Sequence, residues 1–170
     1  MLDLAGIAGD SIVDGPGIRT TVFAQVCPHH CPGCHNPETW EFGTGTAMTA
    51  EAVVEIVRAN PLCRGVTFSG GEPFAQAEEF AALGRLLKKS GYEVASYSGY
   101  TFEELLKGTP AQRKLLNVLD VLIDGPFVQA EKSLELNFRG SRNQRILNVP
   151  ASLKAGQAVL ETAPRWLGEY

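Results

Sequence analysis

Hydrophobic and polar positions along the chain follow two periods, one typical of strands and one typical of helices. Short runs rich in β-branched and apolar residues predict strands at 18–26, 65–69, 93–98, 118–123 and 145–149. Between them, apolar residues recur every three or four positions and predict helices at 50–59 and 76–90, then shorter ones at 101–107 and from Pro110. Thr49 and Thr101 are expected to be helix N-caps. Residues 41–48 are interpreted as a connector, and residues 151–170 show no clear pattern.

This regular alternation of strand and helix predicts an α/β fold with a mostly parallel sheet. Four or five βα units are too few for a closed eight-stranded barrel, so we expect a partial, open barrel within one domain spanning residues 1–170. The strands run into small or polar turns at residues 70–72, 98–99 and 124–125, and into a cysteine loop, residues 26–36. Because binding groups collect at the carboxyl ends of parallel strands, these turns are expected to line one site.

The composition and charge exclude several classes of protein. Hydrophobic residues make up 44% and charged residues 20%, as in a soluble globular protein. The net charge of -4 and the pI near 5.4 argue against binding nucleic acid by bulk positive charge. No apolar run is long enough for a membrane span, and the first residues lack the features of a signal peptide. We therefore expect a cytoplasmic protein whose cysteines stay reduced.

The cysteine loop carries the most specific chemical signal. Cys27, Cys31 and Cys34 follow a C-x3-C-x2-C spacing, and the prolines and glycine among them exclude a regular helix. Converging thiolates suit zinc or an iron–sulfur cluster. A structural zinc site would need a fourth ligand, such as one of the three histidines of this loop, and usually takes its ligands as two separated pairs. Because no second pair exists, a four-iron cluster with one iron open to another ligand is favoured over zinc.

A glycine-rich turn, residues 70–73 (GGEP), follows the second predicted strand. Gly70 and Gly71 allow the backbone to approach a ligand closely, and Glu72 can receive a cationic amine. The alternative is an ordinary strand-to-helix turn with a solvated Glu72. Asp124, at the end of an apolar strand, is a candidate for binding a ribose hydroxyl or a cation, or else for initiating a turn.

Other polar and cysteine residues are open to more than one interpretation. Asp14 and Arg19 either shape the entrance of the site or form a purely structural turn. Arg139, Arg142 and Arg145 are candidates for meeting a ligand carboxylate or a partner surface. His29 and His30 are expected to be exposed loop residues, and Cys63 a buried small hydrophobic residue.

Together these motifs resemble the radical S-adenosylmethionine (SAM) superfamily. More narrowly, the chain resembles the activating proteins of anaerobic ribonucleoside-triphosphate reductase, which are glycyl-radical-enzyme activases. The similarity covers residues 10 to about 149. It rests on residues 14–19 (DGPGIR), 31–40 (CPGCHNPETW), 69–73 (SGGEP), 98–100 (SGY), 124–128 (DGPFV) and 139–144 (RGSRNQ).

The resemblance implies a specific chemistry. Cys27, Cys31 and Cys34 would hold a [4Fe-4S] cluster, and SAM would bind the fourth iron through its amino and carboxylate groups. Reductive cleavage of SAM would yield a 5′-deoxyadenosyl radical that removes a hydrogen from a glycine of the reductase. The electron would come from a donor such as flavodoxin or ferredoxin.

The resemblance also assigns residues to the cofactors. Gly70, Gly71 and Glu72 would lie against the SAM amino group, with Gly33 and His35 near the adenine. Ser98 and Asp124 complete the expected cofactor-binding set. The wider superfamily often has an aromatic residue before the third cysteine, where this chain has Gly33.

Two alternatives stay open at this point. One is a related radical SAM enzyme that activates another glycyl-radical enzyme or acts on a small molecule. The other is a non-catalytic zinc- or cluster-binding module that recruits a partner.

Overall fold

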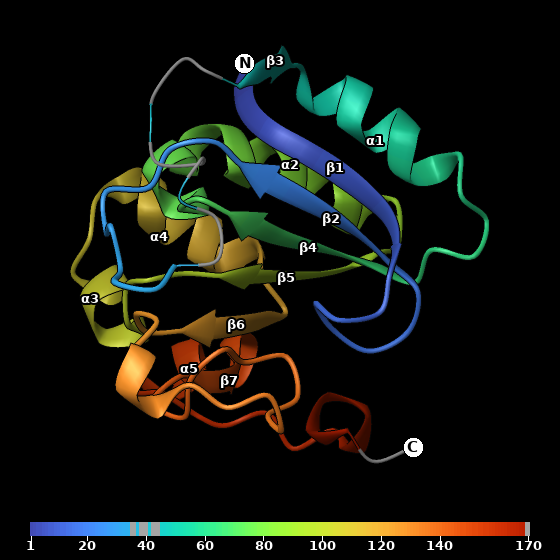
Figure 1. The fold of residues 1–170 in the computed structure, drawn as a ribbon. Helices are drawn as coiled ribbons and strands as arrows, with labels where there is room; N and C mark the ends of the chain where they lie inside the picture. The colour runs from blue at the N-terminus through green and yellow to red at the C-terminus, as the bar shows by residue number, and fades with distance from the viewer. Residues whose placement is uncertain (35–36, 38–40, 42–44, 169–170) are drawn as a thin grey trace.

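A computed structural model describes residues 1–34, 37, 41 and 45–168 (Figure 1). Its strands form one seven-stranded sheet in the order β3-β1-β2-β4-β5-β6-β7. Strands β2, β4, β5 and β6 are parallel to one another, whereas β1, β3 and β7 pair antiparallel with their neighbours. The strands are β1 (Leu2–Ser11), β2 (Arg19–Ala24), β3 (Thr46–Met48), β4 (Gly65–Gly70), β5 (Glu93–Tyr97), β6 (Val121–Asp124) and β7 (Arg145–Asn148).

Helices α1, α2 and α4 lie on one face of this sheet (Figure 1). The larger core packs there, where the buried aromatic rings of Phe68 and Phe80 meet edge to face. The helices are α1 (Ala50–Arg58), α2 (Ala77–Lys89), α3 (Phe102–Leu106), α4 (Pro110–Val118) and α5 (Val149–Ala155), with 3-10 turns at Pro73–Gln76, Gln129–Glu131 and Pro164–Leu167. None of the described helices is long and apolar enough to span a membrane.

The local capping signals are confirmed. The Thr49 hydroxyl accepts a hydrogen bond from the backbone of Ala52 at 3.1 Å, and Thr101 forms a complete capping box with Glu104. Val53, Val54 and Val57 of α1 are buried as the apolar period predicts. Ile56 is 44% exposed, because its position falls at the edge of the buried stripe rather than within it.

The opposite face of the sheet has its own smaller core over β5, β6 and β7. Ala95, Val121, Ile123 and Ile146 pack there against Trp166, which is fully buried. The C-terminal 3-10 turn therefore covers part of the sheet, which gives the patternless tail a packing role.

The predicted α/β fold with a sheet parallel in its middle is confirmed, and the sheet is open. The antiparallel strands β1 and β3 were not predicted. Gly6 and Gly9 interrupt β1, and glycine lowers strand propensity, so this strand depends on its pairing with β2. Strands β2, β4, β5 and β6 all end on the same side, where the cysteine loop leaves β2 (Figure 1).

Candidate cluster and cofactor site

The cysteine loop turns sharply as soon as it leaves β2. Val26 has φ +83° and His30 has φ +48°, and residues other than glycine rarely adopt a positive φ. The strain is greater for Val26, because its side chain is β-branched. The Val26 carbonyl accepts a hydrogen bond from the backbone N–H of Glu72 at 2.6 Å. The strained turn is thus held by the glycine-rich turn at the end of β4.

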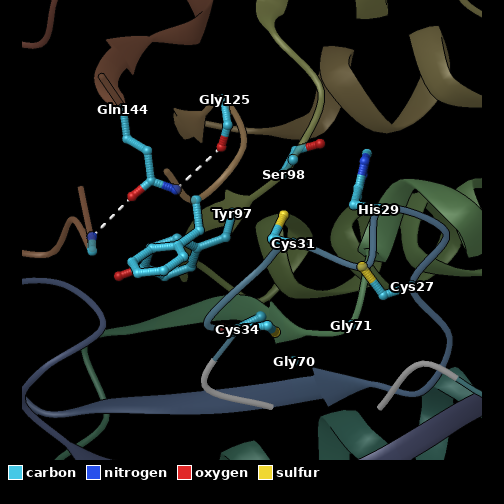
Figure 2. A pocket seen from close by; sticks show the side chains of 14 residues that line it. Cys27, His29, Cys31, Cys34, Gly70, Gly71, Tyr97, Ser98, Gly125 and Gln144 are labelled. Atoms are coloured by element: carbon cyan, nitrogen blue, oxygen red, sulfur yellow. Dashed lines mark hydrogen bonds between the residues drawn. The ribbon is translucent and has the colours of Figure 1, made fainter. Parts of the chain in front are cut away.

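All three predicted thiols line a single cavity, the cysteine cavity (Figure 2). Cys27 is buried, Cys31 and Cys34 are partly buried, and none of the three is in a disulfide. Burial raises the pKa of the Cys27 thiol. The cavity is also lined by the described residues His29, Ser69, Gly70, Gly71, Tyr97, Ser98, Gly99, Gly125, Phe127, Gly140 and Gln144. The predicted convergence of strand ends on one site is therefore present.

The described residues enclose about 180 Å³ in this cavity. A second cavity of about 430 Å³ adjoins it, because Ser69, Tyr97 and Gly140 line both. Both lie at the carboxyl ends of the parallel strands, where α/β folds place their ligands.

The arrangement of the three thiols fits an iron–sulfur cluster. Among the residues that the structure describes, no three Cys, His, Asp or Glu side chains are gathered as ligands of one metal ion. A single ion requires its ligands to converge on one point, whereas each thiolate of a four-iron cluster binds its own iron. Three thiols spread around one cavity can therefore serve a cluster.

Gly70 and Gly71 line the cavity, and both positions require glycine. Gly70 has φ +85°, and a Cβ at this position would lie 2.7 Å from the backbone nitrogen of Ala24. A Cβ at Gly71 would lie 2.2 Å from the Val26 carbonyl oxygen. The two glycines thus allow the end of β4 to press against the start of the cysteine loop.

Glu72 has a different position from the one expected of an amine receiver. Its side chain is fully buried and is not among the residues that line the cavity. The carboxylate accepts hydrogen bonds from the Ser98 hydroxyl at 3.0 Å and from the backbone N–H groups of Gly99 at 2.7 Å and Phe74 at 3.1 Å. Glu72 therefore joins the ends of β4 and β5.

His29 is not the exposed loop residue that the sequence suggested. Nε2 of its ring lies 2.5 Å from Oε1 of Glu72, and the ring packs edge to face on Tyr100 with centroids 4.5 Å apart. Gly99 makes room for it, since a Cβ there would lie 2.5 Å from the ring. Only the three-dimensional packing reveals this role, because a histidine between two cysteines carries no signal of its partner. His30, in contrast, is exposed as expected.

Of the other residues predicted to bind the cofactor, only Ser98 lines the cavity among those that the structure describes. Ser98 lines the cavity, but its hydroxyl donates to Glu72. Asp124 is buried away from the cavity, where it accepts from the backbone of Phe102 at 2.8 Å and pairs with Arg145. Gly33 has φ +74° and packs on the side chain of Gln129 rather than on the cavity, and His35 lies outside the described residues.

Gln144 forms the far wall of the cavity and was not singled out from the sequence. Its side-chain oxygen accepts from the backbone of Gly140 at 2.8 Å, and its amide group donates to the Gly125 carbonyl at 3.1 Å (Figure 2). The only sequence signal for this role was its place in the RGSRNQ motif. In the folded chain this motif lies beside the end of β6.

Arg19 and Cys63 belong to the structural framework. Arg19 is fully buried and bonds to Thr67, Glu93 and the Pro16 carbonyl, so it anchors the DGPG turn. Cys63 is buried, as expected. Asp14 accepts from Ser11 and Thr21 and lines the adjoining cavity.

Comparison with known proteins places this site in a family. The family described as "4Fe-4S single cluster domain" matches residues 13–147. The anaerobic ribonucleoside-triphosphate reductase-activating protein of Salmonella typhi is 36% identical over 141 residues, which is 78% of this chain and 90% of that protein. The corresponding protein of Vibrio cholerae serotype O1 is 35% identical over 144 residues, covering 79% and 90%. The pyruvate formate-lyase-activating enzyme of Clostridium pasteurianum is 41% identical over 123 residues, covering 67% of this chain and 51% of that enzyme.

Proposed function

The chain belongs to the 4Fe-4S single cluster domain family, together with the anaerobic ribonucleoside-triphosphate reductase-activating proteins, and we propose that it installs a glycyl radical on such a reductase. It is an activating enzyme of the radical SAM type. The observation that carries this proposal is the convergence of three thiols outside any disulfide, together with Gly70 and Gly71, on one cavity at the carboxyl ends of parallel strands.

In this proposal Cys27, Cys31 and Cys34 hold a [4Fe-4S] cluster. When bound, the cluster supplies the low-potential electron that cleaves SAM to methionine and a 5′-deoxyadenosyl radical. The protein's task is to place the cofactors and to exclude water from them.

We assign the methionine end of SAM to the backbone of Gly70 and Gly71, which the absence of side chains leaves open to the cavity. Gly33, which does not line the cavity, and His35 are proposed for the adenine side on the family resemblance alone. Glu72 and Asp124 contribute indirectly, because each is buried and already bonded to protein groups that shape the turns around the cavity. Ser98 contributes its position in the cavity wall.

The partner protein, the electron donor and the cellular location are proposed from the same family resemblance. The open sheet is proposed to be a partial barrel whose uncovered side admits a loop of the reductase. A flavodoxin- or ferredoxin-type protein would deliver the electron. We also propose that the protein is cytoplasmic, which the need for reduced thiols supports.

A second candidate function is activation of a different glycyl-radical enzyme. The match to the pyruvate formate-lyase-activating enzyme of Clostridium pasteurianum favours it, although this chain spans only half of that enzyme. Parallel incubations with the two kinds of target protein, each followed for a glycyl radical, separate the candidates.

The chemistry itself is tested by anaerobic reconstitution with iron and sulfide. We expect broad iron–sulfur absorption and, with dithionite and SAM, formation of 5′-deoxyadenosine. Cys31→Ala should abolish both, whereas Cys63→Ala, which removes a buried thiol far along the chain from the loop, should retain both. Stoichiometric zinc without iron–sulfur absorption, or a fully active Cys31→Ala protein, would overturn the assignment.

A further inference from the structure

Tyr97 ends β5 at the point where two cavities meet. Among the residues that the structure describes, Ser69, Tyr97 and Gly140 line both the cysteine cavity and the adjoining cavity of about 430 Å³. Ser69 has a small side chain and Gly140 has none, so the Tyr97 ring is the main barrier between the two spaces. Figure 2 shows this ring on the Gln144 side of the cysteine cavity, away from His29.

The Tyr97 hydroxyl also holds a neighbouring loop. It donates a hydrogen bond to the Phe138 carbonyl at 2.6 Å. Burial raises the pKa of the Tyr97 phenol above its ordinary value, so the group remains a donor at neutral pH. Phe138 has φ +61°, a conformation that is strained for a bulky residue. Its ring packs edge to face on Trp166 with centroids 5.5 Å apart, so both the ring and the carbonyl of this strained residue are secured.

This loop, residues 132–141, forms one wall of the adjoining cavity, and we name it the flap. An antiparallel bridge between Lys132 and Ser141 closes its base. Most residues between these two ends line the adjoining cavity. Leu134 of the flap is 92% exposed, so the flap presents an apolar side chain to the surface.

Residues from the end of β1 to β2 complete the lining of the adjoining cavity. Val13, Asp14 and Phe23 line it together with the flap. Val13 is 69% exposed, so this cavity is reached from the surface past apolar side chains. It is larger than the cysteine cavity, in which the described residues enclose about 180 Å³. A polypeptide segment that approaches the thiols through the larger space therefore meets Tyr97.

We propose that Tyr97 is a positioning residue that confines hydrogen transfer to the target glycine. This inference rests on the proposed function. The target segment occupies the adjoining cavity, and the Tyr97 ring and the flap shield the cysteine cavity from other hydrogen donors in solution.

The source of the hydrogen atom separates a coupled reaction from an uncoupled one. In the coupled reaction a C–H bond of 5′-deoxyadenosine forms while the Cα–H bond of the glycine breaks, so 5′-deoxyadenosine and the glycyl radical appear in equal amounts. In the uncoupled reaction the hydrogen atom comes from the S–H bond of an added thiol, which is left as a thiyl radical, and no glycyl radical forms.

The hydrogen bond between Tyr97 and the flap is tested without the radical reaction. Backbone hydrogen–deuterium exchange is followed by mass spectrometry in the cluster-reconstituted protein, under anaerobic conditions and without SAM. Tyr97→Phe, which keeps the ring and removes the hydroxyl, should accelerate exchange in residues 138–141 roughly fivefold, the factor that corresponds to one net hydrogen bond. Tyr92→Phe is the matched control, because Tyr92 precedes β5 and lines neither cavity, and its flap should exchange as in the unmodified protein.

The shielding role is tested by the origin of the hydrogen in 5′-deoxyadenosine. The reductase is incubated anaerobically with SAM, dithionite and dithiothreitol in D₂O, where the thiol carries deuterium and the glycine Cα carries hydrogen. The unmodified protein and Tyr92→Phe should form undeuterated 5′-deoxyadenosine in an amount equal to the glycyl radical. Tyr97→Leu, which removes the ring, should raise the ratio of 5′-deoxyadenosine to glycyl radical roughly tenfold and place deuterium in the nucleoside, and Tyr97→Phe should raise the ratio less.

A merely structural role of Tyr97 would lower both products together and leave their ratio and the deuterium content unchanged, and that result would overturn the proposal. Flap exchange in Tyr97→Phe equal to that of the unmodified protein would overturn it as well. If Tyr97→Leu does not fold, the ratio and the deuterium content measured with Tyr97→Phe decide the question alone. An unmodified protein that forms no glycyl radical on the reductase would instead overturn the proposed function, a result distinct from an unchanged ratio.

Discussion

Nε2 of His29 lies 2.5 Å from Oε1 of Glu72, and this contact ties the cysteine loop to the glycine-rich turn. The same carboxylate accepts from Ser98 and Gly99 at the end of β5. Three segments that deliver the cavity walls therefore meet at one buried carboxylate. The placement of the thiols depends on residues that need not touch the metal.

Replacing His29 with alanine is expected to loosen the cysteine loop. The change removes a hydrogen bond to a buried carboxylate, which typically costs about 1–3 kcal/mol. We expect lower iron content after reconstitution and a lower melting temperature of the iron-free protein. His30→Ala, at an exposed position in the same loop, is the matched control and should retain full iron content. Equal iron content in both variants would contradict the positioning role of His29.

Glu72→Ala is expected to damage the fold more than the cofactor contacts. Its removal leaves the buried donors of Ser98, Gly99 and Phe74 without their acceptor, so we expect a loss of about 3–5 kcal/mol in the free energy of unfolding. Glu72→Gln keeps one acceptor oxygen and should lose less. Urea unfolding of the iron-free proteins measures both. A fully stable Glu72→Ala protein with weakened SAM binding would instead return Glu72 to the role of an amine receiver.

Gly71→Ala is expected to separate the glycine-rich turn from the cysteine loop. The new methyl group would lie 2.2 Å from the Val26 carbonyl oxygen, so the backbone must shift, at a cost on the order of 3 kcal/mol. SAM binding, followed by equilibrium dialysis, should weaken strongly. Gly6→Ala in β1, where no atom lies within 4 Å of the added Cβ, should bind SAM normally and change stability by about 0.5 kcal/mol or less. Unchanged SAM binding by Gly71→Ala would argue against this turn as part of the site.

Glu93 gives the protein a predictable response to acid. Burial alone would raise the pKa of Glu93, but hydrogen bonds and charge from Arg165 and Arg19 outweigh it, so the pKa is lowered overall. A carboxyl group with a lowered pKa in the folded state contributes stability above its ordinary pKa of about 4.3, and this contribution is lost as the pH falls through the folded-state pKa.

Glu93→Gln should therefore destabilise the protein at pH 7 by about 3 kcal/mol and flatten its loss of stability below pH ~4.5. Chemical unfolding across the pH range from 3 to 8 measures this. Glu55→Gln, at an exposed position on α1, should follow the unmodified protein. A Glu93→Gln profile parallel to that of the unmodified protein would show that this ion pair does not govern the acid response.

The elements that the sequence predicted well are those with strong local signals. The helix from Ala50 to Arg58 has a clear apolar period and a capping threonine, and β4 and β5 are short runs with apolar and β-branched residues between polar turns. The apolar run predicted as a strand over 118–123 forms β6 only from Val121, because Val118 still belongs to α4. The three cysteines and two glycines share the cavity as expected, because their strands are neighbours and end on one side.

What the sequence did not reveal depends on contacts between distant segments. Glu72 and Asp124 are typical ligand-binding residues by type and place, yet each is saturated by donors that only the folded chain brings near: Ser98 and Gly99 for one, Phe102 and Arg145 for the other. Strand β1, with its two glycines, pairs with β2 on one side and β3 on the other, and these partners are distant or unpredicted in the sequence. Such roles have no periodicity and no motif of their own.

The central claim is that this protein generates a glycyl radical on a partner. The most direct measurement is electron paramagnetic resonance after anaerobic incubation of the reconstituted protein with SAM, dithionite and an anaerobic ribonucleoside-triphosphate reductase. We predict a glycyl-radical signal on the reductase that requires all components and is absent with Cys31→Ala. Formation of 5′-deoxyadenosine without a radical on the reductase, or on pyruvate formate-lyase as the second candidate, would contradict the activase assignment.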